Sequence, residues 1–186
     1  MRQSVGGAWL FSISITLMMF IIAYVAITMD YSNSYQLKND VVLILEEYNG
    51  LNNLSGPKII AQFKKRKFTT KIDCAKTYDT STYYEGAHGG YGHRYFYAVT
   101  SYQGTGVIEP VDSRNVTSKE AFLCIYKYTS MKKDASDSTA QIEKSFYAVS
   151  TAFGFDFPII GNIFDYRVTG ETGEINYTND LGYGFD

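Results

Sequence analysis

An uninterrupted apolar run dominates the start of the chain. No charged residue occurs between Arg2 and Asp30, and residues 8–29 read AWLFSISITLMMFIIAYVAITM. Roughly 22 helical residues, each rising about 1.5 Å, are enough to cross a hydrocarbon layer of about 30 Å. A cleaved signal peptide would have a shorter apolar segment and a small-residue cleavage site, and this run offers only a poor one. The pattern therefore predicts a retained transmembrane helix over residues 8–29, after a leader formed by residues 1–7.

The helical pattern continues beyond the apolar run. No Pro or Gly occurs between Ala8 and Asn49. Apolar residues then recur at spacings of three and four, which is typical of an amphipathic helix. They are Leu37, Val41, Ile44 and Tyr48. Asn49-Gly50 is a suitable stop, because glycine readily adopts the left-handed conformation of a helix C-cap. The sequence predicts one helix to about residue 49, apolar all round in its first half and amphipathic in its second.

Short runs with β-type alternation follow residue 57. We predict strands over residues 58–74, 93–102, 121–129, 145–157 and 163–169. One face of the third strand is expected to carry Phe122, Cys124, Tyr126 and Tyr128, and one face of the fourth Phe153, Phe155 and Phe157. The stretch QGTGVIEPVDSRN, which begins at Gln103, is predicted to be a loop.

These elements indicate an α+β fold, in which the long N-terminal helix packs on a four- to five-stranded antiparallel sheet. The composition agrees, since the chain has 17 Tyr and 12 Phe. Tyrosine suits a half-buried pleated surface, although it suits a binding face equally well.

Charge predicts the orientation in the membrane. The leader carries Arg2, whereas no basic residue follows the apolar run before Lys38. The positive-inside rule therefore places the leader in the cytoplasm and residues 30–186 outside, as one extracytoplasmic or cell-surface domain. With 17 basic and 19 acidic residues, the chain gives no reason to expect specific nucleic-acid binding.

Cys74 and Cys124 are the only cysteines. An isolated pair in an exported domain predicts a disulfide, and two buried free thiols are the alternative. A metal site is not expected from this pair, because the chain lacks a CxxC motif and has only two histidines.

Candidate chemistry is sparse. His88 and His93 lie five residues apart in GAHGGYGHRY, but zinc sites need three or four ligands. The motifs GxSxG, HExxH, GxGxxG and the Walker A loop are absent. We therefore expect no enzyme activity and no cofactor.

Two clusters of charged residues could bind a ligand, but each also has an interpretation that needs no ligand. Lys64, Lys65, Arg66 and Lys67 form a basic run. The run could contact a polyanion, or it could protect a solvated strand edge from unwanted pairing. The tail has acidic residues among glycines, namely Glu171, Glu174 and Asp180. Oxygen-rich loops can hold calcium, but this spacing matches no EF-hand and no metal is expected.

The layout resembles the type IV pilin and pseudopilin superfamily, including the TadE-like minor pilins of bacterial tight-adherence and secretion systems. The likeness lies in the leader ending at Gly6-Gly7, the helix with an apolar and an amphipathic half, and the small sheet. The segments FPIIG at residues 157–161 and VTGETG at residues 168–173 are similar to the ends of some membrane-anchored proteins of such systems. Pilins carry a glutamate at the fifth position after the leader glycine; cleavage after Gly7 would place Ser12 there.

The resemblance implies that the helix assembles with other pilin-like or assembly-platform proteins, or with copies of itself. Small residues on a helix face allow such close approach. The candidates are Ser12, Ser14, Thr16 and Ala23. The sequence thus favours a pilin-like minor subunit or pseudopilin of a bacterial surface or secretion apparatus. The alternative is an anchored extracellular binding or adhesion module that does not assemble into filaments.

Overall fold

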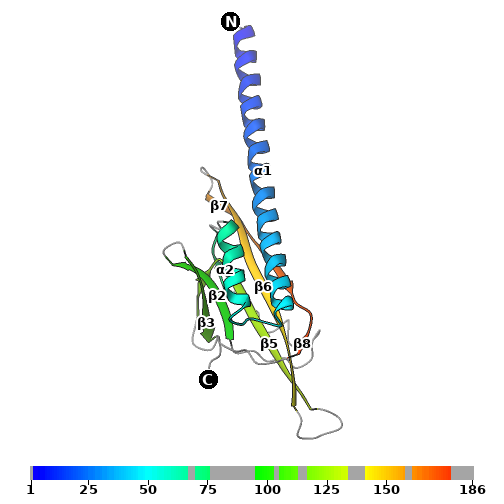
Figure 1. The fold of residues 1–186 in the computed structure, drawn as a ribbon. Coiled ribbons are helices and arrows are strands. Elements are labelled where there is room, and N and C mark those ends of the chain that lie inside the picture. The colour runs from blue at the N-terminus through cyan, green and yellow to red at the C-terminus, as the bar shows by residue number, and fades with distance from the viewer. Residues whose placement is uncertain are drawn as a thin grey trace.

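The computed structural model describes residues 2–66, 70–75, 95–102, 105–112, 117–133, 141–157 and 161–176. The helices are α1 (Arg2–Glu47) and α2 (Ser55–Arg66). The strands are β1 (Ile72–Asp73), β2 (Tyr95–Tyr102), β3 (Thr105–Asp112), β4 (Glu120–Ala121), β5 (Leu123–Lys133), β6 (Gln141–Phe157), β7 (Gly161–Glu171) and β8 (Ile175–Asn176). Figure 1 shows α1 projecting far beyond the sheet with its N-terminal half, while its C-terminal half lies along the sheet. The predicted α+β class is confirmed.

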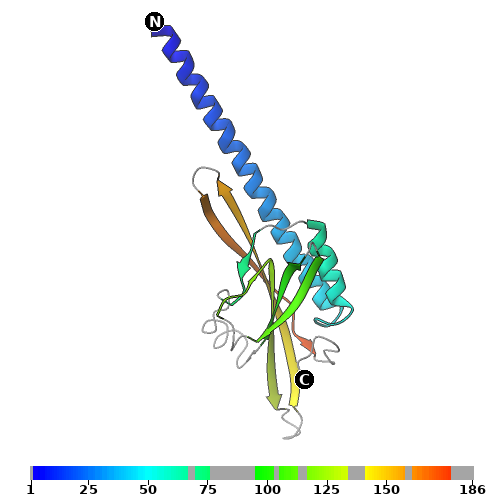
Figure 2. The same cartoon turned by 90° about the vertical axis from the view of Figure 1, so that its left-hand side faces the viewer.

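The main sheet is antiparallel and has the order β3-β2-β5-β6-β7, with β8 pairing to β6. A second, two-stranded sheet joins β1 to β4. The strand β6 pairs with β5 only as far as Thr151, whereas its pairing with β7 continues to Phe157. The ends of β6 and β7 therefore form a two-stranded ribbon that extends beyond the other strands, beside α1 (Figure 2).

The end of α1 follows the predicted stop. The backbone N–H of Gly50 donates to the carbonyl of Leu45 at 2.7 Å, and that of Asn49 donates to Glu46 at 3.3 Å. Asn49 has a φ of 52° and Gly50 a φ of 119°. This is the Schellman arrangement, which satisfies the last carbonyls of the helix. A Cβ at Gly50 would also come within 2.8 Å of Tyr147 Oη, so glycine is required on two counts.

The prediction of a strand over residues 58–74 is wrong, because most of this segment belongs to α2. Asn52 begins the helix: its Oδ1 accepts from the backbone N–H of Leu54 and Ser55, each at 2.9 Å. Ser55 Oγ accepts in return from the N–H of Asn52 at 2.8 Å, which completes a reciprocal cap. Ile59 and Phe63 are buried four residues apart, as one helix face requires.

The helices cover one face of the sheet. The residues buried there come from α1, α2, the turn between the two helices and alternate positions of the strands, as the period of two requires. They are Leu37, Val41, Ile44, Leu45, Leu51, Ile59, Phe63, Tyr97, Val99, Ile108, Leu123, Ile125, Tyr147, Val149 and Ile175.

The opposite face carries a second buried cluster that includes Cys124, Tyr126 and Tyr128. Phe122 was predicted to share this face, but it packs against the helix-side cluster, with its ring centroid 5.5 Å from that of Phe63. A bend at Phe122 between β4 and β5 breaks the alternation. The predicted loop after β2 is also wrong, because it contains β3. This strand lies at the edge of the sheet, where Pro110 is tolerated.

Candidate functional site

The apolar half of α1 is the candidate site. Its large side chains are exposed, with Trp9 at 70%. The helix is long and apolar enough to cross a membrane, and a signal sequence near the N-terminus would meet the same criteria. In water this surface would be strongly unfavourable, since each Å² of exposed apolar area costs about 25 cal/mol. The apolar half therefore requires a partner that is lipid or another apolar surface.

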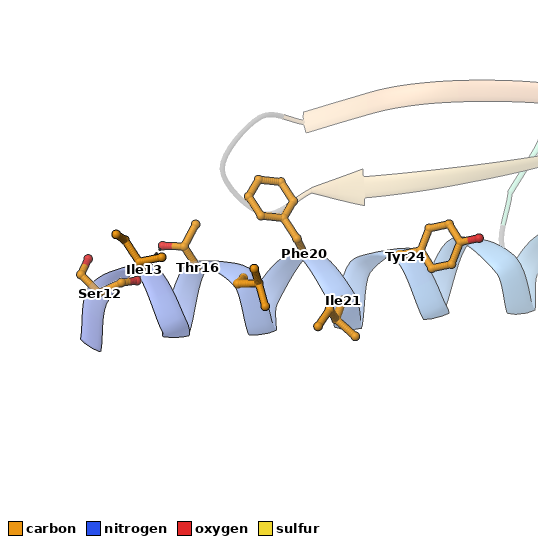
Figure 3. A pocket seen from close by; sticks show the side chains of 7 residues that line it. Ser12, Ile13, Thr16, Phe20, Ile21 and Tyr24 are labelled. Atoms are coloured by element: carbon orange, nitrogen blue, oxygen red, sulfur yellow. Dashed lines mark hydrogen bonds between the residues drawn. The ribbon is translucent and has the colours of Figure 1, made fainter. Parts of the chain in front are cut away.

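A shallow, open groove runs along one face of this half (Figure 3). Its lining residues are Ser12, Ile13, Thr16, Leu17, Phe20, Ile21 and Tyr24. Thr16 Oγ1 donates to the carbonyl of Ser12 at 2.9 Å, so its hydroxyl is satisfied within the helix and needs no outside partner in an apolar medium. Ser14 lies about 160° away from both around the helix axis, at about 100° per residue, so it does not share their face.

Ala23, another candidate for the packing face, is buried within the chain. It is 8% exposed, whereas its neighbours Ile22 and Tyr24 are 62% and 69% exposed. Ala26 and Ile27 flank the same face and are half-buried. In Figure 3, Phe20 points to the side on which the ends of β6 and β7 lie, and Ile21 points away from it. Of the predicted packing residues, Ser12 and Thr16 thus remain open to a neighbouring helix on this face.

Aromatic rings join α1 to the sheet just below this level. Tyr31 packs edge-on against Phe153 of β6, with 5.3 Å between ring centroids. It also stacks on Tyr35 of α1 at 6.2 Å. Phe153 in turn stacks on Tyr166 of β7 at 5.5 Å. Edge-on and offset pairs of this kind contribute about 0.5–1.5 kcal/mol each beyond their buried area. These contacts therefore hold β6 and β7 against α1 at Phe153 and Tyr166.

Lys38 is buried at the next turn of α1. A Cβ added at Gly170 of β7 would come within 2.6 Å of Lys38 Cδ, so the lysine stem lies directly on the strand backbone. Its Nζ lies 4.2 Å from the ring centroid of Tyr35. The stem is thus used as apolar packing while the ammonium faces an aromatic ring.

The basic run does not act as one cluster. Arg66 Nη2 pairs with Asp40 Oδ2 at 2.6 Å, and Arg66 Nη1 donates to Gln36 Oε1 at 2.8 Å. Arg66 therefore ties the last turn of α2 to α1. Lys64 and Lys65 are exposed in the same turn, where their charge complements the helix dipole.

Lys67 lies outside the described residues, so the predicted polyanion contact is reduced to two exposed lysines on the part of the run that the structure describes. The pairing of Arg66 with Asp40 was not predicted. The sequence offers no signal for an ion pair between residues 26 apart on two helices.

The predicted disulfide is present. Cys74 and Cys124 are joined, with Cα atoms 5.6 Å apart, and both are fully buried. Tyr126 Oη donates to the carbonyl of Cys74 at 2.9 Å. The bond attaches the segment after α2 to β5, on the sheet face opposite the helices.

Two surface groups have shifted pKa values. The hydrogen bond that Lys119 Nζ donates to Glu109 lowers the pKa of the Glu109 carboxyl, and Thr100 Oγ1 donates a further one at 3.3 Å. The hydrogen bond between Lys58 Nζ and Tyr48 Oη raises the pKa of Lys58. Both pairs lie at the surface, where their contribution to stability is small.

The residues considered for metal binding can be placed only in part. Glu171 and Glu174 are exposed, and Asp180, His88 and His93 lie outside the described residues. Within the described ranges, no group of three His, Cys, Asp or Glu side chains is placed to hold a metal ion.

Comparisons with known proteins identify no relative: no family model, no curated protein and no solved structure matches the chain.

Proposed function

We propose that this chain is a membrane-anchored, pilin-like minor subunit or pseudopilin of a bacterial surface or secretion apparatus. The observation that carries the proposal is the exposed, apolar N-terminal half of α1. The same helix continues without a break into a C-terminal half that packs on an antiparallel sheet. A helix of this kind can lie in a bilayer and can also pack beside other apolar helices. The role is non-catalytic, in keeping with the absence of catalytic motifs from the sequence.

The proposed topology has the leader in the cytoplasm and the domain outside. The Arg2 charge supports it through the positive-inside rule. The buried Cys74–Cys124 bond supports it independently, because disulfides persist in oxidising compartments. A membrane-impermeant thiol reagent should label Leu54→Cys in intact cells, since Leu54 is 67% exposed in the turn between α1 and α2. Labelling only after lysis would reverse the orientation.

The proposed contact between subunits uses the face that carries Ser12 and Thr16, where small residues allow helices to approach closely. We expect Ser12→Leu with Thr16→Leu to weaken co-purification with partner subunits in the native host. Membrane insertion should persist, because leucine is at least as favourable as serine in lipid. Ser14→Leu is the control: it places one leucine on the opposite face and should leave co-purification intact.

The alternative, an anchored binding or adhesion module that does not assemble, is favoured by one observation. Ala23 is covered within the chain, which leaves only part of the expected packing face open. For this function the double leucine variant would behave like the control, and a soluble fragment beginning near Tyr31 would retain surface or secretion activity. That combination of results would replace the pilin-like proposal.

A further inference from the structure

The ribbon formed by the ends of β6 and β7 reaches the apolar half of α1. Beyond Ala152 the two strands pair only with each other, from Phe153 opposite Tyr166 to Phe157 opposite Gly161. Both views of the fold show this ribbon running beside α1 towards its N-terminus (Figures 1 and 2).

Its reach along α1 follows from backbone geometry. The contact between Phe153 and Tyr31 fixes one level. Four further residues of β6 extend about 13 Å at about 3.3 Å each. The same distance corresponds to about nine helical residues, which brings Phe157 to the level of Ile22. The low exposure of Ala23 agrees with this estimate.

This level conflicts with a hydrocarbon layer that extends to Met29. A two-stranded ribbon has open backbone edges, and hydrocarbon does not tolerate unpaired N–H and C=O groups. The ribbon also contains Asp156 and Asp165, whose carboxylates are costly in lipid. The hydrocarbon must therefore end near Ile22. The uncharged run has room for this shift, because residues 3–22 form about 20 helical residues, or about 30 Å. Residues 3–7 of the leader then enter the hydrocarbon, and Arg2 lies at its cytoplasmic edge.

The composition of the ribbon suits the layer just outside the hydrocarbon. Its strand residues include no Lys or Arg, and most of the large ones are aromatic or aliphatic. They are Phe153, Phe155, Phe157, Ile163, Phe164 and Tyr166. Aromatic residues concentrate at the interface between lipid and water.

We propose that the ends of β6 and β7 rest in the headgroup layer of the outer leaflet and set the depth of α1, with the hydrocarbon boundary at Ile22–Ala23. This inference rests on the anchoring part of the proposed function. It adds a second membrane contact, made by the domain itself, whose partner is the lipid surface.

Tryptophan quenching in phosphatidylcholine vesicles tests the inference on the full chain. The acyl chains carry bromine either near the headgroups or near the chain ends. The native Trp9 reports insertion and should lose emission mainly with the deep bromines. On a Trp9→Phe background, Phe157→Trp should lose more emission with the shallow bromines than with the deep ones. Met29→Trp, about 10 Å farther out along α1, and Leu54→Trp should lose little with either.

The outcomes separate the two proposals. If Trp9 is not quenched, the anchor fails and this inference fails with it. If Trp9 is quenched but Met29→Trp is quenched as strongly, the boundary lies farther out and the inference alone is overturned. The same holds if Phe157→Trp is unquenched or is quenched mainly by the deep bromines. Met29 is an exposed residue of α1, so its result stands even if substitution at Phe157 disturbs the strands.

Discussion

The close contact between Lys38 and Gly170 gives a sharp test of how α1 is attached to the sheet. A methyl group at Gly170 would lie 2.6 Å from Lys38 Cδ and 2.9 Å from its Cε. Carbon atoms in contact are about 3.5–4.0 Å apart, so the lysine stem or the strand must move by about 1 Å. Overpacking costs about 1–3 kcal/mol, and the lower end of that range applies here because the crowded atoms belong to a flexible lysine stem. We expect Gly170→Ala to lower the free energy of unfolding by that amount.

Removing the lysine stem should reverse the effect of Gly170→Ala on stability, so that the substitution becomes stabilising. In a Lys38→Ala background the space at Gly170 is free, and alanine then reduces the conformational entropy of the unfolded chain. At a compatible position this effect stabilises a protein by about 0.4–1 kcal/mol. The two substitutions should therefore show strong coupling in a double-mutant cycle, as residues in direct contact do.

The assay is urea unfolding of the full chain in mild detergent, followed by near-ultraviolet circular dichroism of its tyrosines. Gly173→Ala is the matched control, because a Cβ there would meet only Glu46 Oε1 at 3.9 Å. Additive effects of Gly170→Ala and Lys38→Ala would refute the reasoning. So would an equal loss of stability in the control.

Three further predictions concern the covalent link, the pH dependence and the assembly face. Replacing Cys74 and Cys124 by alanine should lower the stability of the full chain by about 4 kcal/mol, the chain-entropy value for a separation of 50 residues, as measured by urea unfolding. The lowered pKa of Glu109 stabilises the fold above about pH 4.3, its unfolded value. This contribution is lost as the pH falls through the pKa of Glu109 in the folded protein. Glu109→Gln should remove the contribution and change the free energy of unfolding by less than about 1 kcal/mol, as measured by unfolding at a series of acidic pH values. Thr16→Cys should form crosslinked dimers in native membranes, whereas Ala23→Cys should not.

The sequence predicted the helices and strands in which apolar residues recur at a regular spacing. The end of α1 followed from Asn49-Gly50, and four strands of the main sheet followed from alternation. The segment that became α2 was misread because its β-branched and aromatic residues suit a strand. Its helical signal was local: Asn52 and Ser55 form the cap, and Ile59 and Phe63 are spaced four apart.

Other features depend on contacts between distant segments, which a single sequence does not display. Arg66 gave no sign that it pairs with Asp40, since either residue would also suit a solvated helix surface. Ala23 qualified as a packing residue by its size alone. Only the fold shows that Ala23 is buried within the chain. Strand β3 was missed because Gly and Pro ordinarily mark loops, whereas an edge strand tolerates both.

One face of α1 contacts the chain's own domain in its C-terminal part and is open to another helix in its N-terminal part. At about 100° per residue, Ser12, Thr16, Ala23 and Val41 lie within about 40° of one another. Val41 packs in the buried cluster between α1 and the sheet, and Ala23 is buried within the chain, so a second helix can use this face only N-terminal to Ala23. The open stretch back to Ser12 measures about 16 Å. A neighbouring subunit that packs there must be displaced along the helix axis towards the N-terminus of α1. In the proposed arrangement, the domain limits both how deep α1 enters the bilayer and where along its length another helix can bind.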